Sequence, residues 1–516
     1  KNYKRTIRMA ADRVFANARI YALDGPGTIA EAMAVDNQRI TAIGSLADVR
    51  AAAGTGADEI DLSGKTVIPG CYDTHCHLMM HGSACIRSAD LTDCRSIKEL
   101  QKRLRDHWAK NPNASCIVGE RFDQELFAEG RWVTRDDLDE IARDIPVVVA
   151  RLCYHAVVAN TAVLERSRDR LNAEQWKTGI LTEDDVEIAW SQVPECTPEE
   201  LEKAALHAFN EARSAGLTSV NTQIDSIEEL ELLRRLRDEG RLPVRIRFQW
   251  PYHLMDKLVE DGLKTTSGDD FLRVGAIKIF MDGSMGARTC AMIEEFADDP
   301  GNCGNLFRSA DDLAEMLVKV QRNGNQAAIH TIGDLAISTA VNGIEKAMPE
   351  GNAGNARRHR LEHVAQMSPK ILDDMRRLNV MASVQPQFVI TDFWTCDRVG
   401  RERYKYVYPF RSMLSCGIKF GMGSDCPVER LNTMELLHRA VNRDAMSQHE
   451  CLTVEQTLRA YTGGSAYICF EENDKGSLEP GKLADFVVLS EDPFTAEKTH
   501  LGNIRPVNTV VGGNMQ

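Results

Sequence analysis

Histidine and aspartate side chains stand at the ends of several short apolar segments, where they could bind a metal ion. His75 and His77 are separated by one residue in DTHCH, so in a strand both imidazoles would face the same side and could share an ion. His330 follows QAAI, His363 ends RLEH, and Asp425 lies in GMGSDCP. Taken singly, each has a structural alternative as a buried histidine bonded to a carbonyl or an aspartate that caps a turn.

Lys278 lies among apolar residues in GAIKIFMDG. One interpretation is a packed aliphatic stem whose ammonium reaches water. An ammonium would be repelled by bound cations, whereas a lysine carbamate formed with CO2 would be an anionic oxygen ligand able to bridge two ions. Two divalent ions would lower the pKa of a bridging water and polarise a carbonyl, while Asp425 takes and returns the proton. The whole set is therefore sufficient for hydrolysis.

Eight short β-branched runs alternate with helical stretches, which indicates an α/β fold with a parallel sheet. The runs cover residues 66–77, 216–223, 243–250, 274–283, 326–334, 358–364, 380–387 and 418–427. Eight such units predict a (β/α)8 TIM barrel, which takes about 250 residues and tolerates insertions. The candidate ligands fall at the carboxyl ends of the runs, where such a barrel builds its active site.

The remaining segments predict two further units. Short strand-like segments broken by turn residues occur near the start of the chain and recur only near its end. The two termini are therefore expected to fold together beside the barrel. The gap after the first run contains its own helices and strands, which predicts an inserted subdomain at residues 84–205 with a lid or substrate-shaping role.

Composition narrows the class of protein. The 516 residues carry a formal net charge of −14, which argues against nucleic acid or an anionic membrane as a partner. No apolar run approaches the roughly 18 residues of a membrane span, and the first residues lack the apolar stretch of a secretory signal. The fourteen cysteines are scattered without CxxC pairs, which favours reduced thiols and a cytoplasmic protein. No GxSxG elbow or Gly-rich phosphate loop offers a competing chemistry.

The motifs VIPGCYDTHCHL, IKIFMDGSMGART, AIHTIGD, RLEHV, SVQPQF and GSLEPGKLADFVVLSEDP occur in this order along the chain. From about residue 12 to the end, the sequence resembles the amidohydrolase superfamily, and more narrowly the branch that includes N-substituted formamide deformylase. The resemblance implies a barrel at 66–470 and a small β-sandwich built from residues 10–65 and 471–516. It also implies that His75 and His77 bind the buried metal, that carboxylated Lys278 bridges, that His330 and His363 bind the second metal, and that Asp425 ligates and transfers protons.

Substrate contacts are less well defined by the sequence. The DGSMGART segment resembles a signature of this branch, so Asp282, Gly283 and Arg288 are candidates for the pocket, although Arg288 could equally pair with a nearby acid. His155, in RLCYHAVVAN, could reach the pocket from the insertion as a catalytic oxyanion donor. Relatives often have Gly-His-His or Asp-Gly-His where this chain has Leu-Cys-Tyr before His155. Three wall residues complete the set of candidates, with a core or rim position as the alternative for aromatics: Trp132, Gln385 and Trp394.

The predicted function is metal-dependent hydrolysis of a C–N bond other than a peptide bond, in an amide or N-substituted formamide. A metal-bridged hydroxide would attack, and Asp425 would act as the proton shuttle. The expected cofactors are two divalent ions, with zinc favoured. The expected partner is a small-molecule substrate, and a homodimer is the default oligomeric state from frequency alone. Alternatives are a mononuclear, deaminase-like site with uncarboxylated Lys278, an ester or lactone hydrolase, and a binding protein without catalysis.

Overall fold

The largest sheet is a parallel barrel of eight strands. The computed structural model describes residues 11–348, 354–443 and 448–515. Its barrel strands follow one another in chain order: β8 (Cys71–Cys76), β14 (Leu217–Gln223), β15 (Arg245–Pro251), β16 (Leu272–Phe280), β17 (Ala327–Thr331), β18 (Arg360–His363), β19 (Met381–Val384) and β20 (Phe420–Met422). The segment after β20 is tied back to β8, because the Asp425 amide donates to the His75 carbonyl and the His77 amide donates to the Cys426 carbonyl, both at 2.7 Å. The predicted (β/α)8 barrel is confirmed.

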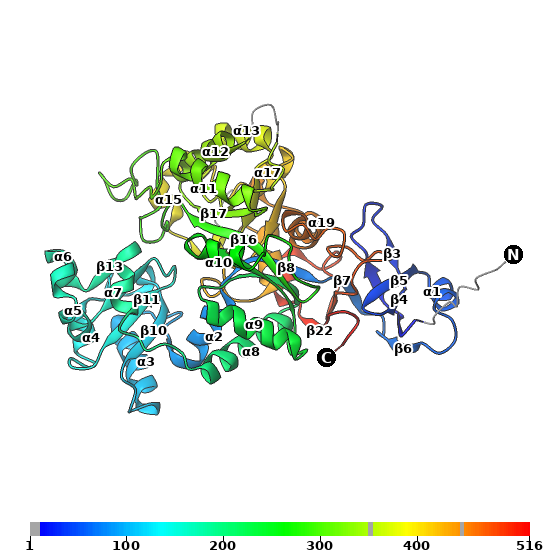
Figure 1. Ribbon diagram of the computed structural model, residues 1–516, viewed down its shortest axis with the longest axis horizontal. Helices are drawn as coiled ribbons and strands as arrows, with labels where there is room; N and C mark the ends of the chain where they lie inside the picture. The colour runs from blue at the N-terminus through cyan, green and yellow to red at the C-terminus, as the bar shows by residue number, and fades with distance from the viewer. Residues whose placement is uncertain (1–10, 349–353, 444–447, 516) are drawn as a thin grey trace.

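Helices surround the barrel strands (Figure 1). They include α2 (Leu78–Arg87), α8 (Pro198–Ser214), α9 (Ile227–Asp238), α10 (Met255–Glu260), α11 (Ala310–Arg322), α12 (Asp334–Ala347), α13 (Pro369–Leu378), α17 (Phe410–Ser415) and α18 (Thr433–Val441). Their ends follow local sequence signals. In α13, Ser368 caps the first turn by accepting from the Ile371 amide, Pro369 occupies the first helical position, and Asn379 ends the helix in the left-handed conformation.

The run 66–77 is not one strand, which corrects the predicted start of the barrel. Residues of β7 (Thr66–Pro69) pair with β2 (Arg19–Tyr21) and β21 (Phe486–Leu489), whereas the barrel strand β8 begins at Cys71. Gly70 lies between them, and a Cβ on it would come within 2.0 Å of the Thr218 Oγ1 atom. Only glycine lets the chain pass from one sheet to the other at this distance.

Both chain ends contribute to two further sheets beside the barrel, at the right of Figure 1. One sheet has the order β5 (Arg39–Gly44), β4 (Ala32–Asp36), β1 (Arg13–Ala16), β6 (Asp58–Asp61), and the other β22 (Pro506–Val510), β21, β7, β2, β3 (Ile29–Ala30). Phe15 of the first sheet and Phe486 of the second meet edge to face, with ring centroids 4.8 Å apart. Segments more than 450 residues apart thus share one apolar core.

The inserted region has its own five-stranded sheet, at the left of Figure 1. Its order is β13 (Ile180–Thr182), β12 (Ala156–Ala159), β11 (Val147–Arg151), β10 (Ile117–Phe122), β9 (Ala89–Asp90), and α3 (Ile97–Lys110) packs against β10 and β9. The expected limits 84 and 205 fall inside α2 and α8, which pack against each other as barrel helices. The separate sheet therefore occupies less of the chain than the sequence predicted.

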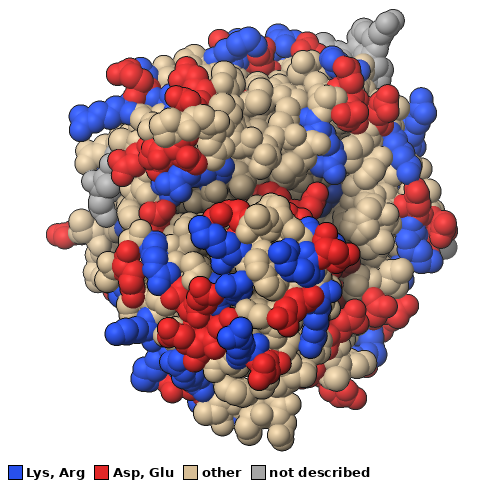
Figure 2. All heavy atoms as spheres, turned by 90° about the vertical axis from the view of Figure 1, so that its left-hand side faces the viewer, with Lys and Arg blue, Asp and Glu red and all other residues tan. Residues whose placement is uncertain are grey.

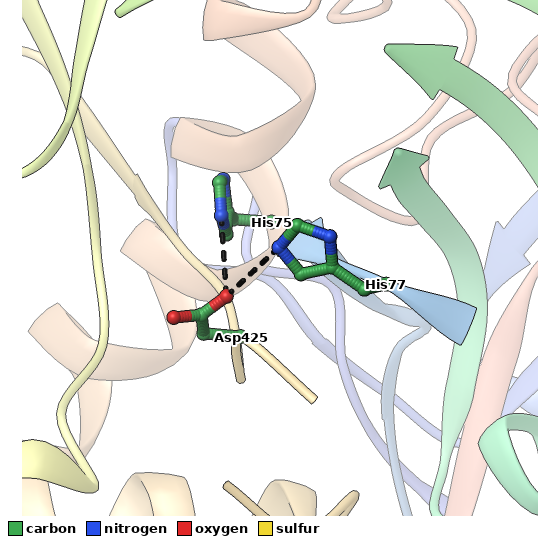
Figure 3. A group of neighbouring side chains, drawn as sticks. All are labelled: His75, His77 and Asp425. Atoms are coloured by element: carbon green, nitrogen blue, oxygen red, sulfur yellow. Dashed lines mark ion pairs between the residues drawn. The ribbon is translucent and has the colours of Figure 1, made fainter. Parts of the chain in front are cut away.

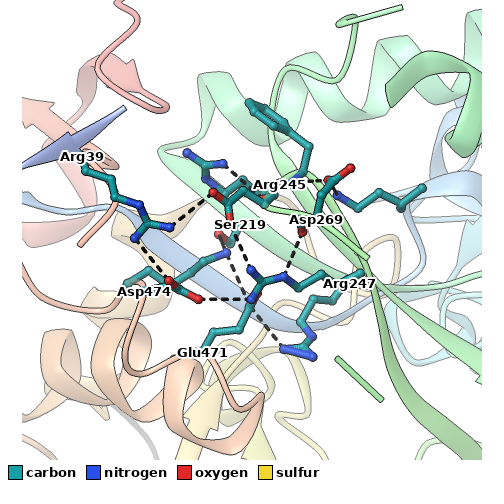
Figure 4. A network of polar contacts seen from close by, with 12 residues as sticks. Arg39, Ser219, Arg245, Arg247, Asp269, Glu471 and Asp474 are labelled. Atoms are coloured by element: carbon teal, nitrogen blue, oxygen red, sulfur yellow. Dashed lines mark hydrogen bonds and ion pairs between the residues drawn. The ribbon is translucent and has the colours of Figure 1, made fainter. Parts of the chain in front are cut away.

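Buried charges join the terminal unit to the barrel (Figure 4). Arg245 of β15 donates two hydrogen bonds to Asp485, at 2.7 and 2.9 Å, and both side chains are at most 3% exposed. Glu471 lies 3.5 Å from Arg247 of β15, and Arg39 of β5 reaches Asp270, just before β16, at 3.4 Å. These contacts fix the orientation of the two units relative to each other.

The sequence predicts no membrane-spanning segment and no disulfide framework. No helix among them combines the length and the apolar character needed to cross a bilayer. All fourteen cysteines are described, and each is a free thiol.

Candidate functional site

The six predicted metal ligands meet at the carboxyl end of the barrel. His75 lies at the end of β8, and its Nε2 is 3.2 Å from Asp425 Oδ1. His77 directs its own Nε2 at the same oxygen, also at 3.2 Å (Figure 3). Lys278, within β16, places Nζ 3.3 Å from His75 Nε2. One group of ligand atoms therefore converges on the Oδ1 side of Asp425.

A second pair of imidazoles lies beside this group. His330 Nδ1 and His363 Nε2 are 3.1 Å apart, and His363 Nδ1 is 4.0 Å from Asp425 Oδ2. Burial lowers the pKa of His363 to about 3 and that of His330 well below its usual value, so both rings are neutral. Neutral imidazole is the form that binds a metal.

The outward nitrogen of three of these rings is held by a protein oxygen. His330 Nε2 donates to the Gly283 carbonyl at 3.0 Å, and His363 Nδ1 donates to Gln385 Oε1 at 2.9 Å. His75 Nδ1 faces Glu362 Oε2 at 2.8 Å. Because a carbonyl can only accept, the Gly283 contact places the His330 proton on Nε2 and leaves the lone pair of Nδ1 directed at the centre. Metal-binding histidines are oriented in this way.

The two imidazoles are close enough to share an ion. His330 Nδ1 and His363 Nε2 are 3.1 Å apart, so both nitrogens could bind one divalent cation. The backbone is also constrained here, because His363 and Asp425 adopt positive φ values of 73° and 58°. Such conformations are costly for residues with side chains and cluster at functional sites.

Lys278 is buried without a close ion pair. Its side chain is 2% exposed, and among the described residues no carboxylate lies within ion-pair distance of its ammonium. Its close contacts are His75 Nε2 and the ring of Phe280, whose centroid is 4.9 Å from Nζ. Burial lowers the pKa of Lys278 to about 8, although the charges of Glu362 and Asp425 partly offset it. A larger share of Lys278 is therefore neutral at pH 7 than of an exposed lysine.

His155 reaches the same pocket from the inserted subdomain. Its ring centroid is 5.2 Å from that of His330, and its Nδ1 lies 2.9 Å from Glu183 Oε2. Burial alone would lower the pKa of His155, but the hydrogen bond and charge of Glu183 outweigh it and raise the pKa to about 9. With Nδ1 bonded to the carboxylate, Nε2 is the nitrogen available to a ligand.

Several residues predicted to contact substrate have other positions. Asp282 is fully buried and accepts from the amides of Ala291, Ile332 and Gly333, so it supports the loop behind His330. The Gly283 carbonyl orients His330. Neither residue is among those that line the pocket, and a direct contact of either with the substrate stays a prediction.

Three further residues predicted to contact substrate also have other partners in the structure. Arg288 is paired with Asp298 at 2.8 Å, the alternative that the sequence left open. Trp132 packs against Phe122 within the core of the insertion, with centroids 6.0 Å apart. Gln385 is 1% exposed and positions His363 rather than lining the pocket. Long side chains in loops find partners that strand periodicity does not reveal.

The pocket above the ligands has walls from both the barrel and the insertion. It is lined by Asp123, Arg151, Leu152, Cys153, His155, Ser284, Met285, Gly286, His330, Ile332, His363, Ala365, Phe388, Thr391, Asp392, Trp394, Tyr408, Asp425, Val428 and Glu429. Sequence reasoning overlooked Asp392 and Glu429, although both follow barrel strands, where the same rule that found the ligands applies. Arg151 is the last residue of β11 in the insertion, and no pattern in the sequence marks it.

Glu362 is expected to control metal affinity through His75. In a Glu362→Gln protein, His75 loses its anionic partner, so zinc affinity should fall by about 10–100-fold. Competition with a chromophoric chelator measures the change, and Glu402→Gln, whose side chain is 96% exposed, is the matched control. Circular dichroism verifies folding, because Arg360 also donates to Glu362, at 2.7 Å. An affinity equal to wild type would show that this contact has no role in binding.

Comparison with known proteins agrees with this geometry. The chain is 28% identical to YtcJ from Bacillus subtilis (strain 168) over 523 residues, 96% of this chain and 97% of that protein. It is 26% identical over 542 residues to N-substituted formamide deformylase from Arthrobacter pascens, which covers 97% of each chain. A crystal structure of an uncharacterized metal-dependent hydrolase from Pyrococcus horikoshii OT3 superimposes with a TM-score of 0.80 at 29% identity, over 95% of this chain and 99% of that one.

The sequence profile of the amidohydrolase family matches residues 58–515, which is most of the chain. The match includes the barrel strands and all six converging side chains. The protein therefore belongs to the amidohydrolase family and is a metal-dependent hydrolase.

Proposed function

We propose that this protein hydrolyses the C–N bond of a small-molecule amide or N-substituted formamide. The observation that carries the proposal is the arrangement of His75, His330 and His363, whose outer nitrogens lie against protein oxygens. His75 Nε2 is 3.2 Å from Asp425 Oδ1, and His330 Nδ1 is 3.1 Å from His363 Nε2. The similarity to N-substituted formamide deformylase supports the choice of bond.

The donor set divides into two groups. His75, His77 and Asp425 would hold one ion, and His330 and His363 would hold the other. Lys278, as a carbamate, would bridge them. Imidazole-rich sets with carboxylate oxygens favour zinc. Ions bound here would supply Lewis acidity that acidifies water and polarises a carbonyl.

The chain's own side chains would transfer the protons and stabilise charge. Asp425 Oδ1 is shared by His75 and His77, so Oδ2 is the atom that would accept the proton of the attacking water. The same carboxyl would return the proton to the leaving nitrogen. His155 Nε2 would donate to the carbonyl oxygen as negative charge develops, since its Nδ1 is bonded to Glu183.

Metal analysis tests this proposal. After reconstitution with zinc and bicarbonate, we expect two ions per chain and zinc-dependent hydrolysis of members of an amide and formamide panel. Lys278→Met should bind fewer ions, whereas Lys370→Met, at a lysine 85% exposed, should match wild type. One ion per chain with unmodified Lys278 would favour the mononuclear alternative. A metal-free protein that hydrolyses the panel, or a reconstituted protein that binds no metal, would contradict the proposal.

A further inference from the structure

Two carboxylates in the active-site pocket have no part in the proposed reaction. Asp392 follows α14 (Phe388–Thr391) beyond β19, and Glu429 lies in the loop after β20. Both line the same pocket as His330, His363 and Asp425. Seen from the side of the inserted subdomain, the molecule is hollowed between two lobes, and acidic side chains lie in the hollow (Figure 2).

Each carboxylate is held on one oxygen only. Tyr408 donates its hydroxyl to Asp392 Oδ2, and Thr391 donates its hydroxyl to Glu429 Oε1. Among the described side chains, no lysine or arginine forms an ion pair with either acid, and none donates to Asp392 Oδ1 or Glu429 Oε2. Glu429 is nevertheless 7% exposed, so the free oxygen of a nearly buried side chain faces the pocket.

The positive charges nearby are already neutralised. Arg151 donates to Asp123 at 3.2 Å and to Gln124 at 2.9 Å. Arg398 contacts Glu125 and Asp298, and its guanidinium lies 4.8 Å from the centroid of the Trp394 ring. The charges of both arginines act on Asp392, but neither forms an ion pair with Asp392 or Glu429. The free oxygens of the two acids therefore have no cationic side chain against them among the described residues.

Aromatic rings lie beside these acids. Phe388 and Tyr408 are 6.3 Å apart between centroids, and Trp394 is 5% exposed. The Trp394 Nε1 is buried and has no hydrogen-bond partner, so one donor beside the pocket is unpaired. Carboxylates combined with aromatic faces are the recognition surface for an organic cation.

Burial without a partner is costly for these acids. It raises the pKa of Asp392 to about 7 and that of Glu429 to about 8, and their mutual repulsion adds to the shift of Glu429. A cation placed between them would restore both to the ionised form. A cationic ligand would therefore offset the free energy that burial of these two carboxylates costs.

We infer that Glu429 and Asp392 form a subsite for an ammonium group of the substrate, so that the substrate is an amide or formamide that also carries a protonated amine. The ammonium would donate to the free oxygens Glu429 Oε2 and Asp392 Oδ1, and its alkyl chain would lie along Phe388 and Tyr408. This inference rests on the proposed function, because the subsite is placed relative to the reacting bond by the metal ligands.

A matched pair of substrates tests the subsite. N-formyl-1,4-diaminobutane and N-formylpentylamine differ only by an ammonium in place of a terminal methyl. We expect wild-type kcat/KM to be at least about tenfold higher for the cationic compound. Glu429→Gln should lower kcat/KM for that compound about tenfold or more, mainly through KM, and change the neutral compound less than about twofold. Asp392→Asn should act in the same direction, and Glu402→Gln should match wild type.

Calorimetry of the zinc-loaded protein separates this inference from the proposed function. Tighter binding of the cationic compound than of the neutral one, lost in Glu429→Gln, supports the subsite even if neither compound is hydrolysed. Equal binding and equal hydrolysis of the pair would overturn the subsite while leaving the hydrolase intact. Equal or undetectable binding without hydrolysis would also overturn it.

Discussion

Replacement of Asp425 with asparagine is expected to lower kcat by about 10²–10⁴-fold, the usual contribution of a positioned acid or base. The change keeps the shape of the side chain and an oxygen near His75 and His77, which lie 3.2 Å from Oδ1. An amide cannot take a proton from water at neutral pH or return it to the leaving nitrogen. The lost rate should therefore appear in the chemical step rather than in substrate binding.

Metal content decides how that result is interpreted. Zinc per chain is measured on the same preparations as kcat, because Asp425 is also a candidate ligand. Asp373→Asn, with a side chain 72% exposed on α13, is the matched control and should retain full activity. An Asp425→Asn protein that keeps its zinc and hydrolyses at the wild-type rate would exclude Asp425 as the proton shuttle.

Arg245→Leu is expected to destabilise the protein by about 3–5 kcal/mol, because it leaves Asp485 buried and without its counter-charge. The side chain of Arg245 is 1% exposed, and both of its bonds to Asp485 cross between β15 and the C-terminal segment. Asp485 would retain the Gly512 amide at 2.8 Å as a donor, but not its ion pair. The loss should appear in the urea midpoint.

An exposed ion pair of the same terminal unit provides the comparison. Arg50 and Glu59 are 53% and 37% exposed, so solvent screens this pair and Arg50→Leu should move the urea midpoint much less than Arg245→Leu. The double variant Arg245→Leu with Asp485→Leu should recover part of the stability, since no charge is left unpaired. If Arg245→Leu were as mild as Arg50→Leu, the buried pair would not hold the two units together.

The fold class and the position of the ligands could be read from the sequence. Apolar runs of strand length separated by helical periods specify a parallel barrel, and the rule that its site lies at the carboxyl ends of the strands selects His75, His330 and Asp425. The structure brings these residues within contact distance. The spacing of buried apolar residues along a strand or helix is a local property, so it can be read directly from the sequence.

The second layer of the site was decided by tertiary structure. Glu362 and Gln385 were found to orient His75 and His363 only when the strands were placed side by side. Asp282 was expected at the substrate and instead binds backbone amides, because a buried carboxylate takes the donors that loop geometry brings to it. Such partnerships depend on distances in space, for which spacing along the chain gives no measure.

The sequence by itself therefore determined the barrel, the family resemblance and the set of side chains at its rim. Tertiary structure decided where the first barrel strand begins. At Gly70 the chain passes from the terminal sheet to the barrel, and a Cβ there would come within 2.0 Å of Thr218 Oγ1. It also decided which walls meet above the ligands, among them Asp392 and Glu429 without a cation. Local periodicity encodes each element, whereas packing between distant segments sets the charge and shape of the pocket.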